Sequence, residues 1–229
     1  MIEEIVPAAA ACAESFAVSP GTGLFPEEEA LVARATEQRR QEFAAGRECA
    51  REALSALGLG KVPILRGYRG APQWPQGVVG SITHCPGYCA AVVARSGDLT
   101  AMGLHAEPDT ALPGGVLELV SQPAERARLR DLSAVAPETS WDRLLFCAKE
   151  AVYKAWFPLT GRWLGFADAE ITIDAAGGTF SARLLVPVPA PDGLPLTGFA
   201  GRWLARDNFL AATIAVPASP GASGRPQRV

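Results

Sequence analysis

The sequence predicts an α+β fold of two similar lobes, each with a long helix followed by an antiparallel sheet. A segment with helical spacing is followed by short strand-like segments, and the same order returns later in the chain. In addition, 229 residues with 48% hydrophobic content can bury a sizeable core, as one domain or as two small lobes. We expect an N-terminal lobe over residues 1–100, a C-terminal lobe over residues 101–217 and a flexible tail over residues 218–229.

The N-terminal lobe starts with a long helical pattern that allows one interruption. Pro26 precedes three glutamates, which is typical of a helix start. Carboxylates favour the positive end of the helix dipole, and the N–H group that proline lacks would have no hydrogen-bond partner in the first turn. Apolar residues then recur at helical spacing until Gly58 ends the pattern. Three strand-like segments separated by turns predict an antiparallel meander over Val78–Thr83, Ala90–Ala94 and Ala101–His105.

The C-terminal lobe repeats this plan. Its helix is expected from Trp141 to Phe157, where Pro158 stops it. Apolar residues on one stripe of this helix should face the core: Trp141, Leu144, Leu145, Ala148, Val152 and Ala155. The strands that follow, joined in part by turns rich in glycine, aspartate and asparagine, are Glu170–Asp174, Thr179–Val186, Gly198–Ala205 and Phe209–Val216.

The charge balance and the lack of long apolar runs exclude several classes of protein. A formal net charge of −3 gives no field that would hold a polyanion, so nucleic acid is not expected as a partner. No apolar run approaches the ~20 residues that a bilayer crossing needs, and the acidic start is unlike a secretory signal, so we expect a cytoplasmic protein. An odd number of cysteines predicts free thiols: Cys12, Cys49, Cys85, Cys89 and Cys147.

Two pairs of residues are candidates for chemistry. Glu150 and Lys154 stand four residues apart on the side of their helix away from the predicted core, and this spacing alone favours a surface ion pair over a site. His105 and Glu107 lie on one side of a strand end, as an exposed hydrogen-bonding pair or as two metal ligands. Together with Glu150 they would form a carboxylate-containing divalent site of the kind that binds substrate phosphates.

Cationic residues in the N-terminal half are candidates for anion binding. His84 lies in a turn, where a lone histidine is usually structural. Arg66 and Arg69 lie in a glycine-rich loop, where they either reach an anion or are solvated. The chain contains neither a Walker loop nor a dinucleotide glycine fingerprint, so ordinary nucleoside triphosphate and NAD sites are not predicted.

Four segments carry a family resemblance when taken in order: residues 39–47, residues 74–85 (WPQGVVGSITHC), residues 103–108 (GLHAEP) and residues 141–158, which contain FCAKEAVYKA. Together they resemble the 4′-phosphopantetheinyl transferases of the two-lobed, surfactin-type class, most closely the actinobacterial members that serve polyketide, fatty-acid and non-ribosomal peptide synthases. The resemblance implies a pseudo-twofold pair of lobes with coenzyme A between them, and a monomer. It implies an enzyme that moves the phosphopantetheine arm onto a serine of an acyl or peptidyl carrier protein and releases 3′,5′-ADP.

Matching positions then imply a role for each candidate residue. Glu107 and Glu150 are implied as Mg²⁺ ligands, and Glu150 also as the general base for the carrier serine. Lys154 would stabilise the charge on the transferring group. The implied contacts to coenzyme A come from Arg39, Arg47 and Arg66, with Arg69 as a weaker candidate, from His84 at the 3′-phosphate with Thr83 beside it, and from Lys149 at the pyrophosphate.

His105 is where this sequence departs from the family pattern, which has an aspartate metal ligand at that position. Mg²⁺ prefers oxygen ligands, so an imidazole is a poor replacement. The expected metal-ligand set is therefore His105, Glu107 and Glu150, with weaker use of Mg²⁺ and with Mn²⁺ as the alternative ion. We also expect metal affinity to fall as His105 is protonated near its ordinary pKa of about 6.5.

Two other functions are weighed against this one. A zinc-dependent hydrolase or deaminase is considered because His105 and Glu107 form an H-x-E motif and Cys85 and Cys89 lie near His84, but the Pro-Cys-x-x-Cys segment that should follow is missing. A catalytically impaired carrier-protein binding module is considered because of the histidine in a ligand position. The other catalytic residues implied by the resemblance are intact, which favours an enzyme.

Overall fold

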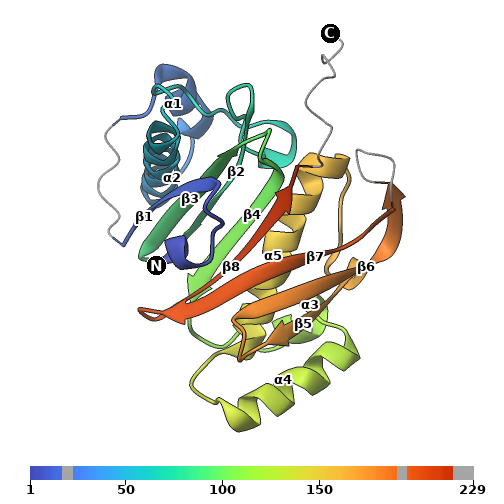
Figure 1. Cartoon of the computed structure of the whole chain (residues 1–229). Coiled ribbons are helices and arrows are strands. Elements are labelled where there is room, and N and C mark those ends of the chain that lie inside the picture. Colours follow the sequence, from blue (N-terminus) through green and yellow to red (C-terminus); the bar gives the residue numbers. More distant parts are fainter. Residues whose placement is uncertain (17–22, 190–194, 219–229) are drawn as a thin grey trace.

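The computed structural model of the chain confirms the predicted α+β class (Figure 1). It describes residues 1–16, 23–189 and 195–218, so the predicted tail beyond residue 218 lies outside the described ranges. A three-stranded antiparallel sheet has the order β1-β3-β2, with β1 at Ala10–Ser15, β2 at Val78–Cys85 and β3 at Tyr88–Arg95. A five-stranded antiparallel sheet has the order β4-β8-β7-β6-β5, with β4 at Leu99–Pro108, β5 at Ala169–Asp174, β6 at Thr179–Pro189, β7 at Pro195–Arg206 and β8 at Phe209–Pro217.

The long helical pattern of the N-terminal lobe forms two helices, α1 (Pro26–Val32) and α2 (Glu37–Ala56). Thr36 caps α2, because its side chain accepts a hydrogen bond at 3.3 Å from the backbone N–H three residues later. A buried ion pair of 2.9 Å between Glu28 of α1 and Arg51 of α2 ties the two helices together. The apolar face of α2 packs on the three-stranded sheet, which fixes the direction of its polar side chains.

The second long helix, α5 (Trp141–Thr160), packs on the five-stranded sheet through the stripe that the sequence predicts. Its expected end at Phe157 is wrong, because the helix runs through Pro158 to Thr160, most of one further turn. Proline has no N–H, so its place in the last turn removes only one backbone hydrogen bond. Gly161 then ends the helix with a left-handed φ of 64° and donates to the carbonyl of Phe157 at 2.8 Å.

The predicted meander is correct for its first two strands and wrong for its third. β2 pairs with β3, but β4 pairs with β8, and the free side of β3 is taken by β1, a strand that the sequence analysis missed. β4 lies beside β2, but the two strands are joined by side-chain hydroxyls and not by backbone–backbone hydrogen bonds. Ser81 and Thr83 accept hydrogen bonds from the N–H groups of Leu104 and Ala106, each at 3.0 Å. We call this junction of the two sheets the β2–β4 seam.

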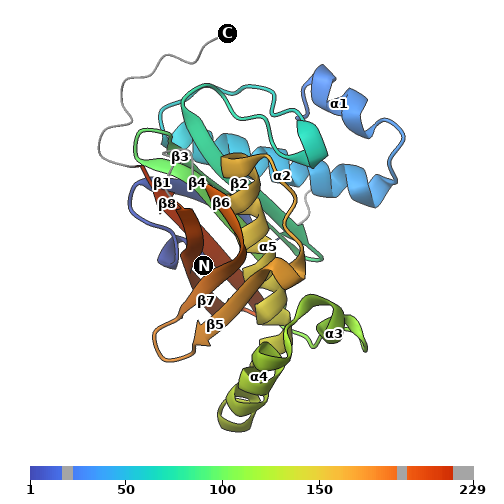
Figure 2. The ribbon, with the colours of Figure 1, turned by 90° about the vertical axis from the view of Figure 1, so that its right-hand side faces the viewer.

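The segment between β4 and α5 forms two helices that the sequence analysis did not predict, α3 (Val116–Val120) and α4 (Pro123–Val135). Only Glu125 and Leu129 of α4 are buried, which explains the weak apolar pattern, and Figure 2 shows this helix projecting away from both sheets. Within the described ranges, no helix is long and apolar enough to cross a membrane. Short 3₁₀ turns occur at Ile2–Glu4, Tyr68–Gly70 and Phe166–Asp168.

Gly103 of β4 lies where the backbones of the five-stranded sheet and α5 are close together. A Cβ atom there would lie 2.0 Å from the carbonyl oxygen of Ala151, a backbone atom that cannot move aside. We expect Gly103→Ala to lower the free energy of unfolding by about 3 kcal/mol, the upper end of the usual cost of overpacking, as measured by urea denaturation. Gly97→Ala is the control, because a Cβ there meets nothing within 4 Å. Equal stability losses in the two variants would contradict this explanation.

Candidate active site

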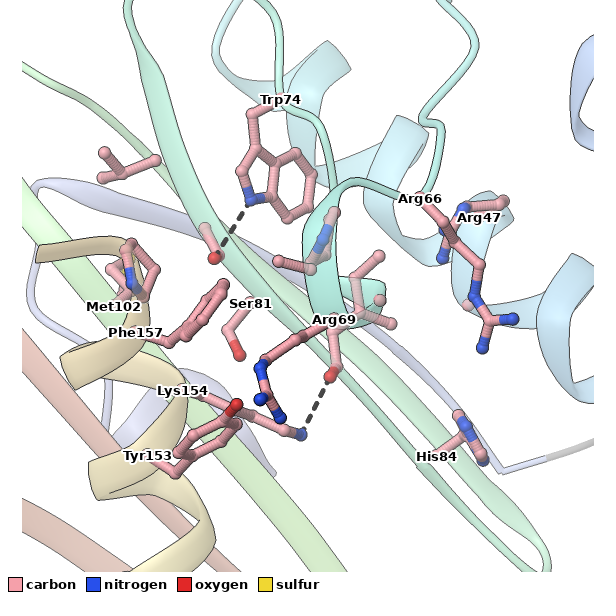
Figure 3. A pocket seen from close by; sticks show the side chains of 18 of the residues that line it. Arg47, Arg66, Arg69, Trp74, Ser81, His84, Met102, Tyr153, Lys154 and Phe157 are labelled. Carbon is pink, nitrogen blue, oxygen red and sulfur yellow. Dashed lines mark hydrogen bonds between the residues drawn. The ribbon is translucent and has the colours of Figure 1, made fainter. Parts of the chain in front are cut away.

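A cavity of about 510 Å³ opens between the two lobes and is bordered by α2, the loop before β2, β2 itself, β4 and α5. Its size is in the range of small-molecule sites in proteins. Figure 3 shows cationic side chains of the N-terminal lobe across the cavity from Tyr153 and Lys154 of α5. The candidate residues that line it are Arg39, Arg47, Arg66, Arg69, His84, Glu150 and Lys154.

Two guanidinium groups share one aromatic ring on the α2 side of the cavity. The guanidinium carbon of Arg47 lies 4.1 Å from the ring centroid of Phe43, and that of Arg66 lies 5.8 Å from it. Arg47 also donates from Nε to the carbonyl of Ile64 at 2.7 Å. Burial lowers the pKa of Arg47 to about 10, so the group is still charged at neutral pH. The ring and the carbonyl position this cationic surface without neutralising it, which suits an anionic ligand.

His84, at the end of β2, joins Arg39 and Glu42 of α2. Nη1 of Arg39 lies 2.7 Å from Nε2 of His84, and because a guanidinium only donates, this nitrogen accepts and the proton is on Nδ1. Nδ1 lies 3.6 Å from Oε2 of Glu42, which Arg39 also contacts at 3.3 Å. Burial and then the charge of Arg39 lower the pKa of His84, so the ring is neutral at pH 7. No role is predicted for Glu42 from sequence, although its spacing of three residues from Arg39 is typical of an ion pair on a helix.

Arg69 lies at the rim of the cavity between exposed aromatic rings. Its backbone is left-handed, with φ at 56°. Its guanidinium carbon lies 5.6 Å from the ring centroid of Tyr68 and 5.1 Å from that of Trp163. Because Tyr68 belongs to the loop before β2 and Trp163 follows α5, this cation bridges the two lobes. No carboxylate among the described residues pairs with it, so its charge is available to a ligand.

The ammonium group of Lys154 lies against the β2–β4 seam. Nζ donates to the carbonyl of Ile82 at 3.0 Å and to that of Leu104 at 2.8 Å. The spacing favours a surface ion pair between Lys154 and Glu150, and this prediction is wrong. The helix packs the side chain of Lys154 against the β2–β4 seam instead. Burial lowers the pKa of Lys154 to about 8, against the opposing charges of Glu150 and Glu107. One of its three donors is left for an acceptor in the cavity.

Glu150, one turn before Lys154, presents an unpaired carboxylate to the cavity. In the described part of the chain, nothing forms a hydrogen bond or an ion pair with it, although the residue is half-buried. Burial raises the pKa of Glu150, the charge of Lys154 opposes this and that of Glu107 adds to it. Glu107 does not line the cavity, but its charge acts on Glu150, Lys154 and His84. The two carboxylates are thus close enough for the charge of Glu107 to act on Glu150.

His105 and Glu107 form the hydrogen-bonded pair that was one of their two predicted arrangements. Nε2 of His105 lies 3.1 Å from Oε1 of Glu107, and because a carboxylate only accepts, the proton is on Nε2. Nδ1 is buried and has no partner among the described residues. Burial lowers the pKa of His105 to about 4, so the expected protonation near pH 6.5 is wrong. Burial would raise the pKa of Glu107, but the His105 hydrogen bond and the charge of Arg143 outweigh it and lower the pKa.

Two residues expected to contact coenzyme A do not reach the cavity. Nζ of Lys149 bonds to Glu125 at 2.9 Å and to the carbonyls of Phe166 and Ala169 at 2.8 and 2.7 Å, which uses all three of its donors inside the C-terminal lobe. The hydroxyl of Thr83 is buried in the β2–β4 seam. Adjacent positions on a helix or strand point in different directions, so neighbours of a site residue are easily misplaced from sequence.

The zinc site of the hydrolase alternative is not formed. Cys85 and Cys89 point to opposite sides of the three-stranded sheet and belong to different core clusters. Over residues 1–16, 23–189 and 195–218, no three histidine, cysteine, aspartate or glutamate side chains are arranged to hold a metal ion. The five cysteines are free thiols, as the sequence predicts.

The site therefore combines a cationic surface, a half-buried carboxylate with a raised pKa and a buried ammonium group in one cavity. Guanidinium groups bind phosphate oxygens well because their parallel N–H groups form two hydrogen bonds at once. A carboxylate next to them can accept a proton from a hydroxyl, and the ammonium can stabilise negative charge. These groups are the ones that a phosphoryl-transfer site needs, because such a site works mainly by positioning the substrate and stabilising charge.

Comparisons with known proteins agree with this chemistry. The family model of the 4′-phosphopantetheinyl transferase N-terminal domain matches residues 27–94, and that of the 4′-phosphopantetheinyl transferase superfamily matches residues 98–190. The chain is 51% identical to 4′-phosphopantetheinyl transferase Svp of Streptomyces mobaraensis over 96% of this chain and 91% of that protein. It is 49% identical to Npt of Nocardia iowensis over 94% and 99% of the two chains, and 49% identical to PptT of Mycobacterium tuberculosis over 89% and 92%. The chain therefore belongs to the 4′-phosphopantetheinyl transferases, the enzymes that transfer the phosphopantetheine arm of coenzyme A to carrier proteins.

Proposed function

We propose that the cavity between the lobes is where this chain binds coenzyme A and transfers its phosphopantetheine arm. The observation that carries the proposal is the unpaired carboxylate of Glu150, which shares one cavity with Lys154 and a cationic surface. The guanidinium groups there fit the phosphates of the coenzyme. The residues assigned to the phosphates are Arg39, Arg47, Arg66, Arg69 and His84.

Glu150 and Lys154 are assigned the chemical step. The carboxylate of Glu150 takes the proton of the carrier serine as the serine oxygen bonds to the phosphorus that carries the pantetheine. The bond from that phosphorus to the oxygen of 3′,5′-ADP breaks, and 3′,5′-ADP leaves. Burial raises the pKa of Glu150, which strengthens it as a base. The free donor of Lys154 stabilises the charge on the transferring phosphoryl group.

The residues present fit a divalent cation, although not as the predicted set of three. Mg²⁺ is usually held by one or two carboxylates together with substrate phosphates, which suits Glu107 and Glu150. His105 donates to Glu107 from Nε2, and its Nδ1 is buried, so it supports a ligand instead of being one. When bound, the ion offsets negative charge on the pyrophosphate.

The partners in this proposal are acyl and peptidyl carrier domains of polyketide, fatty-acid or non-ribosomal peptide synthases. The support is the sequence resemblance to actinobacterial members that serve such synthases. A monomer is part of the same proposal, because the chain already contains both lobes that border the cavity. The proposal also places the enzyme in the cytoplasm.

Mass spectrometry of an apo carrier protein incubated with the enzyme, coenzyme A and Mg²⁺ tests the function. We expect a gain of roughly 340 Da, the mass of one phosphopantetheine group, on the carrier serine. Several apo carriers should be compared to find the preferred partner. A protein that binds carriers but modifies none of them would instead be the catalytically impaired binding module.

The histidine at position 105 should affect the choice of metal. An imidazole that supports Glu107 supplies no oxygen to the ion, whereas His105→Asp adds a carboxylate. We expect the native enzyme to need more Mg²⁺ than His105→Asp for half-maximal transfer. The difference should be smaller with Mn²⁺, because it is Mg²⁺ that demands a near-ideal octahedral set of oxygen ligands. Titrating transfer activity with each ion measures this. Superimposable curves for the two proteins would show that position 105 does not influence the metal.

A further inference from the structure

Arg143, in the first turn of α5, is held in place by backbone groups. Its Nε donates to the carbonyl of Thr110 at 2.9 Å and its Nη2 to the carbonyl of Ala111 at 3.0 Å. The neighbouring Asp142 accepts the N–H of Leu112 at 2.9 Å. These bonds join the start of α5 to the chain that leaves β4. The place of the cation is thus fixed by the fold and not by a flexible partner.

The remaining nitrogen of this guanidinium reaches Glu107. Nη1 of Arg143 lies 3.4 Å from Oε2 of Glu107, while His105 donates to Oε1 at 3.1 Å. Both oxygens of this carboxylate therefore already have a partner. The side chains of Arg143 and Glu107 are only 15% and 19% exposed, so water and salt screen the pair weakly. In the protein without ligand, Glu107 is a neutralised carboxylate.

The same balance of charge continues along α5. Arg143, Glu150 and Lys154 are seven and four residues apart, which places them on one face of the helix. Arg143 offsets Glu107, and Lys154 offsets much of Glu150. The N-terminal lobe adds further positive charge to the cavity: Arg39, Arg47, Arg66 and Arg69. A divalent cation that approaches these carboxylates without the coenzyme therefore meets no net negative charge around the cavity.

We propose that Arg143 is a counter-ion that makes divalent-cation binding at Glu107 and Glu150 depend on the coenzyme. The inference rests on the proposed function, because it takes these carboxylates as the metal ligands. The diphosphate of coenzyme A carries the negative charge that the cavity lacks, so the ion binds together with it. With the ion bound, Arg143 would give up its contact with Glu107 and keep its two carbonyl partners. It is a positioning residue, since it touches neither the substrate nor the reacting atoms.

Electron paramagnetic resonance of Mn²⁺ tests this dependence directly, because it measures the free ion. The native protein alone should leave the Mn²⁺ signal almost unchanged, whereas protein with coenzyme A should bind more Mn²⁺ than a coenzyme A blank. Arg143→Gln removes the charge and keeps a donor for a loop carbonyl. Without coenzyme A, this variant should bind Mn²⁺ on the order of 10-fold more tightly than the native protein, because a cation beside the ligand repels the ion. Arg130→Gln, at an exposed arginine of α4, is the matched control and should behave as native.

Two outcomes would overturn the inference. One is tight Mn²⁺ binding by the native protein without coenzyme A, a measurement that needs no variant and decides the matter if Arg143→Gln does not fold. The other is a folded Arg143→Gln protein whose Mn²⁺ affinity equals the native value. Calorimetric titration with coenzyme A alone separates these results from a failure of the proposed function. Absent coenzyme binding contradicts the cavity assignment, whereas normal coenzyme binding with an unchanged Mn²⁺ affinity contradicts only the role of Arg143.

Discussion

Glu150→Gln should reduce kcat/KM for carrier-protein modification by about 10²–10⁴-fold, the usual contribution of a general base. The amide keeps the shape of the side chain but cannot take the proton of the serine, and it is a weaker metal ligand. Mass spectrometry of the carrier over time gives the rate. Measuring it at increasing Mn²⁺ concentrations separates the two roles, because excess metal restores only the loss that comes from weaker metal binding.

Stability provides the control for this variant. Burial raises the pKa of Glu150, so the folded state disfavours the charged form and this group lowers the free energy of unfolding as pH rises above its ordinary pKa. Glutamine carries no charge, and no hydrogen bond is lost, so Glu150→Gln should melt at or above the native temperature. Glu138→Gln, at an exposed position, should keep the native rate. A Glu150→Gln enzyme of near-native activity would contradict the assignment.

Lys154→Met should reduce transfer by about 10²–10³-fold, the usual loss when a donor that stabilises transition-state charge is removed. It should also destabilise the fold, because the carbonyls of Ile82 and Leu104 each lose a charged donor, and a hydrogen bond to a charged group contributes about 1.5–3 kcal/mol. The carbonyl of Leu104 keeps the Ser81 hydroxyl at 3.5 Å. Single-turnover rates and urea denaturation measure the two effects. Lys149→Met should be at least as destabilising, since its ammonium also has buried partners, but the folded fraction should keep its activity. A folded Lys154→Met enzyme with the native rate would contradict this role.

The pH dependence gives a second measure of Lys154. Burial lowers its pKa to about 8 from an ordinary 10.5, so kcat/KM should fall above about pH 8 as the ammonium loses its proton. Lys154→Arg keeps its charge and should move this limb to higher pH. For stability, the unfolded chain holds the extra proton between these two pKa values, so this group raises the free energy of unfolding as pH rises through that window. Lys154→Met should lack that rise. A native profile that stays flat up to pH 10 would contradict the shift.

Local patterns were enough to predict the elements that support the site. The stripe from Trp141 to Ala155 has the period of a helix packed on one face, and it is buried as predicted. Pro26 and Gly58 mark the ends of the N-terminal helical segment because their effects on the backbone are local. The roles of the guanidinium groups came from the family resemblance, because the residues alone left the loop arginines Arg66 and Arg69 either bound to an anion or solvated.

The remaining errors come from packing between segments far apart in the sequence. Periodicity shows the one face of α5 that contacts its own sheet, and it cannot show that a second face, with Lys154, packs on the other lobe. The contact of Arg143 with Glu107 could not be predicted for the same reason, because Glu107 lies on β4. The partner of β4 was wrong because β1, which takes the free side of β3, has only a short and weakly alternating sequence.

The β2–β4 seam also solves a problem of solubility. β2 and β4 are each the last strand of their sheet at this junction, and a bare strand edge is a template for pairing with another chain. Ser81 and Thr83 cover these edges with hydroxyls, so two surfaces that would favour aggregation are hidden inside one molecule. A variant that kept its catalytic residues but lost these two hydroxyls would have two uncovered strand edges. It would self-associate through them even though its active site was intact.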